Sequence, residues 1–520
     1  MVADALILSL DFGTQSVRAM LFDAHGTVHG KAQLALNDYQ APQPGWMEHD
    51  ADGFWQQLGA VCQQLWSNAA ADARHRLIGI SLTTQRATMV ALDAEGQALR
   101  PAIVWPDQRR ANTLPRLRWH WRSAFRLLGL QHTVQYFHRE ADCNWLAEQQ
   151  PELWSHTAHY LLLSGFLTWK LTGHFRDSTG CQVGYVPYDF KHHRWAAAWD
   201  WKWQALPALR REQLPELLPP GSVLGHITDT ASSHTGIPAG LPLIAAAADK
   251  ACEVLGSGAL QPHIACLSFG TTATINTTQT RYIEPLRFIP PYPAAIPDAW
   301  NTEIQISRGY WMVSWFKEEF GHPEQALAEE LGVTPEQLFE HLADTAEPGA
   351  MGLMLQPYWS PGVKQPGPEA RGAIIGFTDS HNRAHLYRAI LEGLSYALRE
   401  AKEQIEQRSG TRITELRIAG GGSQSDAAMQ LTADIFGLPA TRPRLYEASA
   451  LGAAMVAAVS LGLHADHAAA VKAMCQPGQT FLPDPARQHR YQQLYQRVYR
   501  QLYKRLQPLY RALYDINHSQ

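Results

Sequence analysis

A short glycine-containing turn near the start of the sequence combines residues that could handle phosphate and a metal ion, in the run Asp11-Phe12-Gly13-Thr14-Gln15-Ser16-Val17-Arg18. Glycine lets the backbone come close to a ligand, and the N–H groups of such a turn can donate hydrogen bonds to phosphate oxygens. Asp11 could hold Mg²⁺, usually through water, and the Arg18 guanidinium could donate to phosphate. The run predicts a phosphate site formed by Gly13, Thr14, Gln15 and Arg18, although a plain hairpin turn explains it equally well.

Two later turns have the same glycine-rich character. The first is Gly270-Thr271-Thr272, and the second is Gly420-Gly421-Gly422-Ser423, which lies between a strand-like segment and a helical segment that begins at Asp426. Glycine backbone beside a helix N-terminus is suited to binding a nucleotide. Each turn alone is also explained as a simple connection. Together they predict a nucleotide site that includes Gly270, Thr271, Gly421, Gly422 and Asp426.

The elements that position these turns follow from the hydrophobic pattern. Three strand-like runs predict an antiparallel meander at the start of the chain, over residues 6–10, 17–22 and 27–36. A strand over 241–247 leads into Asp249 and a strand over 265–269 leads into Gly270, so the second half opens as the first does. Helices are expected over 388–408, 426–436, 448–461 and 487–514. The last predicts a packed terminal helix, with a membrane-surface or partner-binding helix as the alternative.

Length and composition limit the class of protein. A chain of 520 residues is longer than one hydrophobic core normally supports, and we expect two domains, residues 1–256 and 257–520. The net charge of −4 argues against a nucleic-acid-binding protein. The six cysteines lack CxxC spacing, which predicts reduced thiols and neither disulfides nor a zinc site. The apolar run near the N-terminus is too short to cross a membrane, so we expect a cytoplasmic protein.

Ordered segments of the sequence resemble the FGGY carbohydrate kinases, a family that includes xylulose, ribulose, gluconate and glycerol kinases. The resemblance runs from Leu6 to about Leu509, and the segments that carry it are Pro44-Gly45-Trp46-Met47-Glu48-His49-Asp50, Thr84-Gln85-Arg86, Trp105-Pro106-Asp107-Gln108-Arg109, 372–377 with 385–392, and 420–423 with 447–452. It implies an α/β fold of two actin-like, ribonuclease-H-like domains. In that fold ATP and the sugar bind in the cleft between the domains, with Mg²⁺ at the phosphates.

The resemblance also implies roles for single residues. Asp249 falls on the family's catalytic base, the carboxylate that accepts the proton of the attacking sugar hydroxyl. Without the family context, the same carboxylate is explained as the N-cap of the helix that follows it. The residues implied in substrate binding are Gln85, Arg86, Trp105, Asp107, Asp249 and Lys250.

The sequence departs from the family pattern close to the expected sugar. Residues 245–248 are alanines where glycines commonly precede the catalytic aspartate, which stiffens the strand-to-helix turn. Lys250 stands where a neutral polar residue is frequent, and it either pairs with Glu253 on the helix surface or faces the sugar and binds a hydroxyl or carboxylate. Ala87 stands where glycerol kinases have glutamate, and this removes a side chain that would hydrogen-bond the substrate.

The leading hypothesis is therefore an active ATP-dependent kinase for a ketose or polyol, with a five-carbon ketose such as xylulose slightly favoured. A glycerol kinase and a sugar-acid kinase are the alternatives within the family. A sugar- or nucleotide-binding regulator that has lost catalysis is the alternative from another class. The expected partner is a small sugar or polyol, without nucleic acid or membrane, and a homodimer is common in the family.

Overall fold

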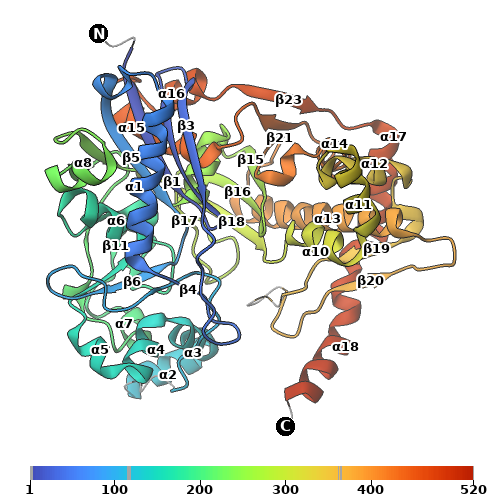
Figure 1. Cartoon of the computed structure of the whole chain (residues 1–520). Coiled ribbons are helices and arrows are strands. Elements are labelled where there is room, and N and C mark those ends of the chain that lie inside the picture. Colours follow the sequence, from blue (N-terminus) through green and yellow to red (C-terminus); the bar gives the residue numbers. More distant parts are fainter. Residues whose placement is uncertain (1–3, 114–116, 118, 361, 363–365, 519–520) are drawn as a thin grey trace.

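The computed structural model describes residues 4–113, 117, 119–360, 362 and 366–518. Figure 1 shows two lobes, each built around a β-sheet with helices on its faces. The blue and green N-terminal half forms one lobe, and the yellow and orange C-terminal half forms most of the other. The predicted two-domain α/β architecture is confirmed.

The first lobe contains a six-stranded sheet in the order β13-β14-β5-β1-β2-β3. Its strands are β1 (Leu6–Phe12), β2 (Ser16–Phe22), β3 (Val28–Ala35), β5 (Leu77–Thr84), β13 (Val223–His226) and β14 (Pro242–Ala245). The antiparallel pairs β1–β2 and β2–β3 confirm the predicted meander, while β1 and β14 run parallel to β5. Side chains alternate along β1, so Leu6 and Leu8 enter one core cluster and Ile7 enters another on the opposite face. Both faces of this sheet are therefore covered.

The second lobe contains a seven-stranded sheet in the order β17-β18-β16-β15-β21-β22-β23. Its strands are β15 (Ile264–Phe269), β16 (Ala273–Gln279), β17 (Tyr292–Pro293), β18 (Trp300–Ile306), β21 (Glu415–Ala419), β22 (Ala440–Pro443) and β23 (Pro477–Phe481). Strand β15 is antiparallel to β16 and parallel to β21, as β1 is to β2 and β5. The repeated strand-and-turn opening predicted for the two halves is thus a repeated sheet topology.

Helices and short strands complete the lobes. The helices of the first lobe are α1 (Ala51–Asn68), α2 (Trp119–Leu128), α3 (Gln131–Glu140), α4 (Asp142–Gln149), α5 (Pro151–His156), α6 (Leu163–Thr172), α7 (Lys202–Ala205), α8 (Asp229–Thr235) and α9 (Asp249–Gly256). Those of the second half are α10 (Trp311–Phe320), α11 (His322–Leu331), α12 (Pro335–Thr345), α13 (Arg383–Ser409), α14 (Asp426–Phe436), α15 (Ala448–Ser460) and α16 (His467–Met474). A four-stranded sheet in the first lobe has the order β4-β7-β6-β8, from β4 (Glu48–His49), β6 (Met89–Leu92), β7 (Ala102–Ile103) and β8 (His159–Leu162). The shorter pairs use β9 (Arg176–Ser178), β10 (Tyr188–Asp189), β11 (Arg194–Trp195), β12 (Glu216–Leu218), β19 (Met354–Gln356) and β20 (Ala373–Ile375).

Helices α9 and α15 cross between the two sheets. A Cβ atom at Gly256 would lie 1.9 Å from the carbonyl oxygen of Ala448, and one at Gly452 would lie 1.9 Å from that of Cys252, so only glycine allows this approach. The small residues of α15 suit this close packing. Figure 1 shows α15, from late in the chain, beside the blue strands of the first lobe. The helix pair therefore joins the cores of the two lobes.

The chain ends in a long helical segment made of α17 (Pro485–Leu494), a π-helical stretch (Tyr495–Tyr499) and α18 (Arg500–His518). Tyr491, Tyr495, Tyr499 and Leu502 are buried in the core of the second lobe, which confirms the predicted packed helix as far as these residues. Beyond them the last turns of α18 extend away from the lobe (Figure 1), where three aliphatic side chains are exposed: Leu509, Leu513 and Ile516. Among the helices of the described ranges, none has the length and apolar character needed to cross a bilayer.

Candidate active site

Asp11 and Asp249 lie at the same edge of the first sheet. Asp11 is near the end of β1, and Asp249 begins the helix that follows β14. Because β1 and β14 are both parallel to the intervening β5, their carboxyl ends meet at this edge. Burial raises the pKa of the Asp11 carboxyl to about 6, against the lowering effect of Arg18, whose Nη1 lies 3.1 Å from Oδ2. The charge of Asp249 raises that pKa further, so the two carboxylates are close enough to interact.

Asp249 does not occupy the N-cap position. Ala248 is the N-cap of α9, with an extended backbone, and Asp249 is the first helical residue. Its Oδ1 accepts a hydrogen bond from the N–H of Lys250 at 2.7 Å. Burial raises the pKa of the Asp249 carboxyl, while the positive charges of Lys250 and Arg86 oppose the rise. A carboxyl with a raised pKa is better matched to accepting a proton near neutral pH than an ordinary surface aspartate.

Lys250 connects the first lobe to the second. Its Nζ lies 2.9 Å from Oε2 of Glu253, as one sequence alternative expected, and it also donates to Oγ of Ser268 on β15. The pair therefore lies between the sheets and not on an open helix surface. A Cβ atom at Gly270 would be 4.0 Å from the same Nζ, so the ammonium group also lies beside the Gly270 turn.

Arg86 makes a second connection of the same kind. Its Nη1 donates to both carboxylate oxygens of Glu303 on β18, at 2.8 and 3.0 Å. Both side chains are largely buried, and the arginine charge favours the ionised form of Asp249. The two cations near Asp249 thus each have an acidic partner of their own, Lys250 with Glu253 and Arg86 with Glu303.

The predicted phosphate turn of the first lobe joins β1 to β2. The N–H of Gly13 donates to the carbonyl oxygen of Ser16 at 3.0 Å, which closes the turn. The hydroxyl of Thr14 accepts a hydrogen bond from Nε1 of Trp105 at 2.8 Å. Gln15 is exposed and Arg18 is partly exposed. The turn is therefore accessible at the sheet edge that carries Asp11 and Asp249.

The two glycine turns of the second lobe pack against each other. Gly270 lies between β15 and β16, and Gly420, with a φ of 85°, follows β21. A Cβ atom at Gly420 would lie 2.9 Å from backbone atoms of Phe269, and one at Gly422 would lie 2.6 Å from the ring of Tyr310. The turn at Gly420–Gly422 needs glycine for this close approach, and β15 and β21 bring both turns to one edge of the second sheet.

Thr271 and Asp426 complete the predicted nucleotide set. Thr271 lies in the β15–β16 turn, where its carbonyl oxygen accepts a hydrogen bond from the N–H of Trp311 at 3.4 Å. Asp426 begins α14, is mostly exposed, and forms an ion pair of 2.7 Å with Arg442. Gly421 begins the 3₁₀ turn that leads into α14, and a Cβ atom there would meet no other atom within 4 Å. The surface at Gly421 is therefore open to a ligand.

The remaining predicted substrate residues differ in what they offer a ligand. Both polar atoms of the Gln85 side chain are buried and have no hydrogen-bond partner at close geometry among the described residues, and the side chain lies near the Tyr39 hydroxyl. The indole of Trp105 is 42% exposed. The carboxylate of Asp107 accepts from the N–H of Met47 at 2.6 Å and from Nε and Nη2 of Arg109 at 2.8 and 2.6 Å. Asp107 therefore holds the loop in shape.

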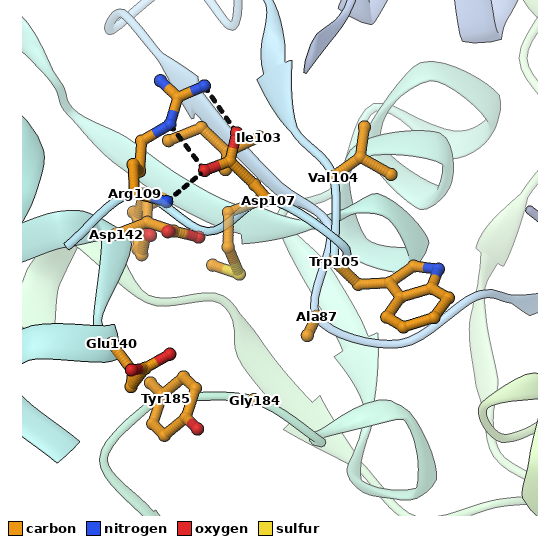
Figure 2. Close-up of a pocket in the computed structure, with 12 residues that line it drawn as sticks. Ala87, Ile103, Val104, Trp105, Asp107, Arg109, Glu140, Asp142, Gly184 and Tyr185 are labelled. Carbon is orange, nitrogen blue, oxygen red and sulfur yellow. Dashed lines mark hydrogen bonds and ion pairs between the residues drawn. The ribbon is translucent and has the colours of Figure 1, made fainter. Parts of the chain in front are cut away.

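A cavity of about 160 Å³ opens beside Trp105 (Figure 2). It is lined by Ala87, Met89, Ile103, Val104, Trp105, Asp107, Arg109, Glu140, Asp142, Tyr160, Gly184 and Tyr185. Sequence reasoning identified the wall at Ala87, Trp105 and Asp107 and missed the opposite wall. Glu140 and Asp142 lie at the junction of α3 and α4, and nothing in their local pattern marks them as facing a cavity.

Asp11 suits a magnesium ion that is shared with a nucleotide. In the ranges that the structure covers, no group of three His, Cys, Asp or Glu side chains could hold a metal ion by itself. Mg²⁺ commonly binds through one or two carboxylates together with phosphate oxygens and water. The buried Asp11 carboxyl, whose pKa is raised by burial and by Asp249, leaves negative charge that a cation would offset. The residues present therefore fit Mg²⁺ bound with phosphates.

Comparison with known proteins places this geometry in a family. Residues 6–256 match the N-terminal domain of the FGGY family of carbohydrate kinases, and residues 265–461 match its C-terminal domain. A sugar kinase of Escherichia coli K12 named YgcE, itself uncharacterized, is 30% identical over 99% of this chain and 96% of its own length. Glycerol kinase of Dechloromonas aromatica is 29% identical over 94% of this chain and 95% of its own.

A solved structure agrees with the sequence matches. Xylulose kinase from Rhodospirillum rubrum superposes with a TM-score of 0.80 at 25% identity, over 97% of this chain and all of that one. Both matches cover nearly the full length of each protein, so the similarity extends over both lobes. The chain belongs to the FGGY family of carbohydrate kinases, enzymes that transfer a phosphoryl group from ATP to a sugar hydroxyl.

Proposed function

We propose that this kinase phosphorylates a neutral polyol or ketose and that Asp249 is its general base. The observation that carries the proposal is the position of Asp249 at the sheet edge, beside Asp11 and between two cations that reach into the second lobe. We further propose that residues 1–256 form the sugar-binding domain and residues 257–520 the nucleotide-binding domain. The phosphate turns at the two sheet edges support this division.

The proposed chemistry needs one proton transfer and one phosphoryl transfer. The substrate hydroxyl donates a hydrogen bond to the Asp249 carboxylate and gives up its proton to it as the oxygen attacks the γ-phosphorus of ATP. The bond between the γ-phosphorus and the bridging oxygen breaks, and ADP leaves. The raised pKa of Asp249 supports its action as the base. Lys250 and Arg86 oppose that rise, and their positive charges favour the ionised carboxylate that accepts the proton.

The nucleotide would be held by the turns of both lobes. The N–H groups of the Gly13 turn and the Gly270 turn would donate to phosphate oxygens, and Gly421 and Gly422 would lie against the nucleoside. Asp11 would hold Mg²⁺, which neutralises phosphate charge when it is bound. Lys250 lies beside the Gly270 turn, which supports a role near the transferred group.

The charge pairing favours a neutral substrate over a sugar acid. Lys250 is engaged by Glu253 and Ser268, and Arg86 is engaged by Glu303 through two hydrogen bonds. A substrate carboxylate would have to compete with these buried acidic partners for either cation. Both the glycerol and the xylulose kinases among the relatives act on uncharged compounds by name.

A coupled assay of ADP release tests the proposal. The purified chain with ATP and Mg²⁺ is screened against ketoses, polyols and sugar acids, and the Asp249→Asn variant is run beside it. We expect turnover with neutral compounds that is lost in Asp249→Asn while calorimetry still detects sugar or ATP binding. Undiminished turnover in Asp249→Asn, or a preference for sugar acids, would contradict the proposal. Binding without any stimulated turnover in the unmodified protein would indicate a regulator instead.

A further inference from the structure

The cavity beside Ala87 adjoins the proposed reaction centre. Ala87 follows Arg86, whose charge acts on Asp249, and Trp105 reaches from the cavity wall to the hydroxyl of Thr14 in the phosphate turn. The cavity therefore lies next to the place where the substrate hydroxyl must bind.

Residues 180–184 join the same two regions from the other side. The carbonyl oxygen of Gly180 accepts a hydrogen bond from the N–H of Ala248 at 3.2 Å, one residue before the proposed base. The carbonyl oxygen of Val183 accepts one from the N–H of Ala87, also at 3.2 Å. A single stretch of backbone thus supports the proposed base and the cavity wall together.

The size of the cavity matters for the length of the substrate. Its volume of about 160 Å³ is many times the roughly 10–15 Å³ that one enclosed water requires. Several non-hydrogen atoms of a ligand can therefore enter it. Ala87 borders the cavity with only a methyl group. Its backbone φ is 52°, a conformation that residues with larger side chains seldom adopt.

Most of the charged groups in the lining already have partners. Asp107 accepts several hydrogen bonds from Arg109, and Arg109 also pairs with Glu48 at 2.8 Å. Glu140 pairs with Arg110 through Oε1 at 2.5 Å. These charged groups therefore already have ion-pair partners within the protein.

Asp142 differs from them. Within the described part of the chain its carboxyl forms no hydrogen bond or ion pair, and Figure 2 shows it on the cavity wall across from Ala87 and Trp105. Burial raises the pKa of Asp142 to about 7, with a further rise from the charge of Asp107 and an opposing effect from Arg109. A largely buried carboxyl without a partner is costly, and a ligand hydroxyl that hydrogen-bonds to it would offset that cost.

We infer that this cavity receives the end of the substrate remote from the transferred phosphoryl group and that Asp142 hydrogen-bonds to a hydroxyl at that end. The inference rests on the proposed function and narrows it to neutral polyols or ketoses with four or more carbons. Three carbons would satisfy Asp249 and leave the cavity empty, whereas an acidic terminus would meet the carboxylates of Asp107, Glu140 and Asp142.

The test varies the number of carbons in the substrate and the side chain at position 142 together. The kcat/KM values of glycerol and of neutral four-, five- and six-carbon polyols and ketoses are measured for the unmodified enzyme, Asp142→Ala, and Glu152→Gln as a control with an exposed carboxylate on the neighbouring helix. We expect Asp142→Ala to raise KM for the best longer substrate by about tenfold. The kcat/KM for glycerol should change by less than about twofold, and Glu152→Gln should change neither.

A second variant keeps the inference testable if Asp142→Ala folds poorly. Asp142→Leu replaces the carboxyl with an apolar group of similar shape, so it should lower kcat/KM for the longer substrates by about tenfold or more and spare glycerol. Asp142 also lies in the first turn of α4, and a purely structural role there predicts a lower unfolding temperature with equal effects on all substrates.

The outcomes separate this inference from the proposed function. Equal losses for glycerol and longer substrates in both variants, or glycerol as the best substrate of the unmodified enzyme, would overturn the cavity assignment and leave Asp249 as the base. Full turnover in Asp249→Asn would overturn the proposed function itself.

Discussion

The two sheets present nearly the same turn, Asp11-Phe12-Gly13-Thr14 in the first lobe and Ser268-Phe269-Gly270-Thr271 in the second. Each follows the central strand, β1 or β15, and leads into an antiparallel neighbour. The same strand-and-turn backbone occurs twice, but its first residue carries a carboxylate at Asp11 and a hydroxyl at Ser268. Asp11 pairs with Arg18, whereas Ser268 accepts a hydrogen bond from Lys250.

This difference separates what the repeated backbone provides in both lobes from what single side chains add in each. Two equivalent turns can both offer N–H groups to phosphates, since that requires only backbone geometry. Only the first can also supply negative charge for a cation, and only the second has an ammonium group beside it. The helices that follow β14 and β22 differ in the same way, because α9 begins with Asp249 whereas α15 begins with Ala448.

The largest expected effect comes from removing the carboxylate at the start of α9, which α15 lacks at its own start. Asp249→Asn should lower kcat by about a thousandfold, since a positioned general base contributes on the order of 10²–10⁴. Steady-state ADP release measures it. Asp229→Asn, at the exposed first position of α8, is the matched control and should keep full kcat. A loss of less than tenfold in Asp249→Asn would mean that another group takes the proton.

Making the first turn like the second tests the role of its charge. Asp11→Ser should lower kcat by about a hundredfold and raise the Mg²⁺ concentration for half-maximal activity, because charge that stabilises the phosphates is lost. A titration of Mg²⁺ at saturating ATP measures both. Ser268→Ala should leave the Mg²⁺ requirement unchanged. An unchanged requirement in Asp11→Ser would show that the two turns are equivalent in chemistry as well as in backbone.

A third experiment breaks the contact between the equivalent helices. Gly452→Val places a side chain where a Cβ would already lie 1.9 Å from the Cys252 carbonyl oxygen, so α9 and α15 must separate. The free energy of unfolding should fall by about 2 kcal/mol or more. Urea denaturation measures it, with Ser449→Val on the partly exposed side of the same helix as control. Equal stability of the two variants would contradict the crossing.

The smallest effect concerns pH. The folded-state pKa of Asp11 is about 6 and its ordinary value is 3.8, so the folded protein binds this proton more tightly than the unfolded chain does. The buried, ionised carboxyl therefore lowers stability above pH 6, and this cost disappears as the pH falls toward 4. Without nucleotide, Asp11→Ser should be more stable than the unmodified protein at pH 7.5, by about 2 kcal/mol.

Unfolding temperatures of the two proteins across pH 4 to 8 check this prediction. The difference between them isolates Asp11 from other titrating groups, and it should shrink steadily below pH 6. A constant difference across the range, or a variant that is less stable at pH 7.5, would contradict it. A gain in stability together with a loss of activity would show that the charge at Asp11 is kept for function.

Local patterns in the sequence were enough for much of the fold. The meander and the helix over Asp426–Phe436 depend on hydrophobic periodicity and on turn residues within a few positions of each other. The glycine-containing turn identified Asp11, and the resemblance to the family identified Trp105 and Asp249. Their spacing along the chain carried that information, because each segment is a strand end or a turn.

The partners of those residues were decided by tertiary structure. Arg86 meets Glu303 across 217 positions, and the α9–α15 crossing joins residues almost 200 positions apart. The cavity depends on Ala87, Asp142 and Tyr185, which belong to three separate segments of the chain. The sequence by itself determined the strands, helices and glycine turns of this kinase, because these depend on residues that are neighbours in the chain. Only the packing of distant segments decided which charges are paired and which carboxyl is left free, since burial and contact are properties of the folded whole.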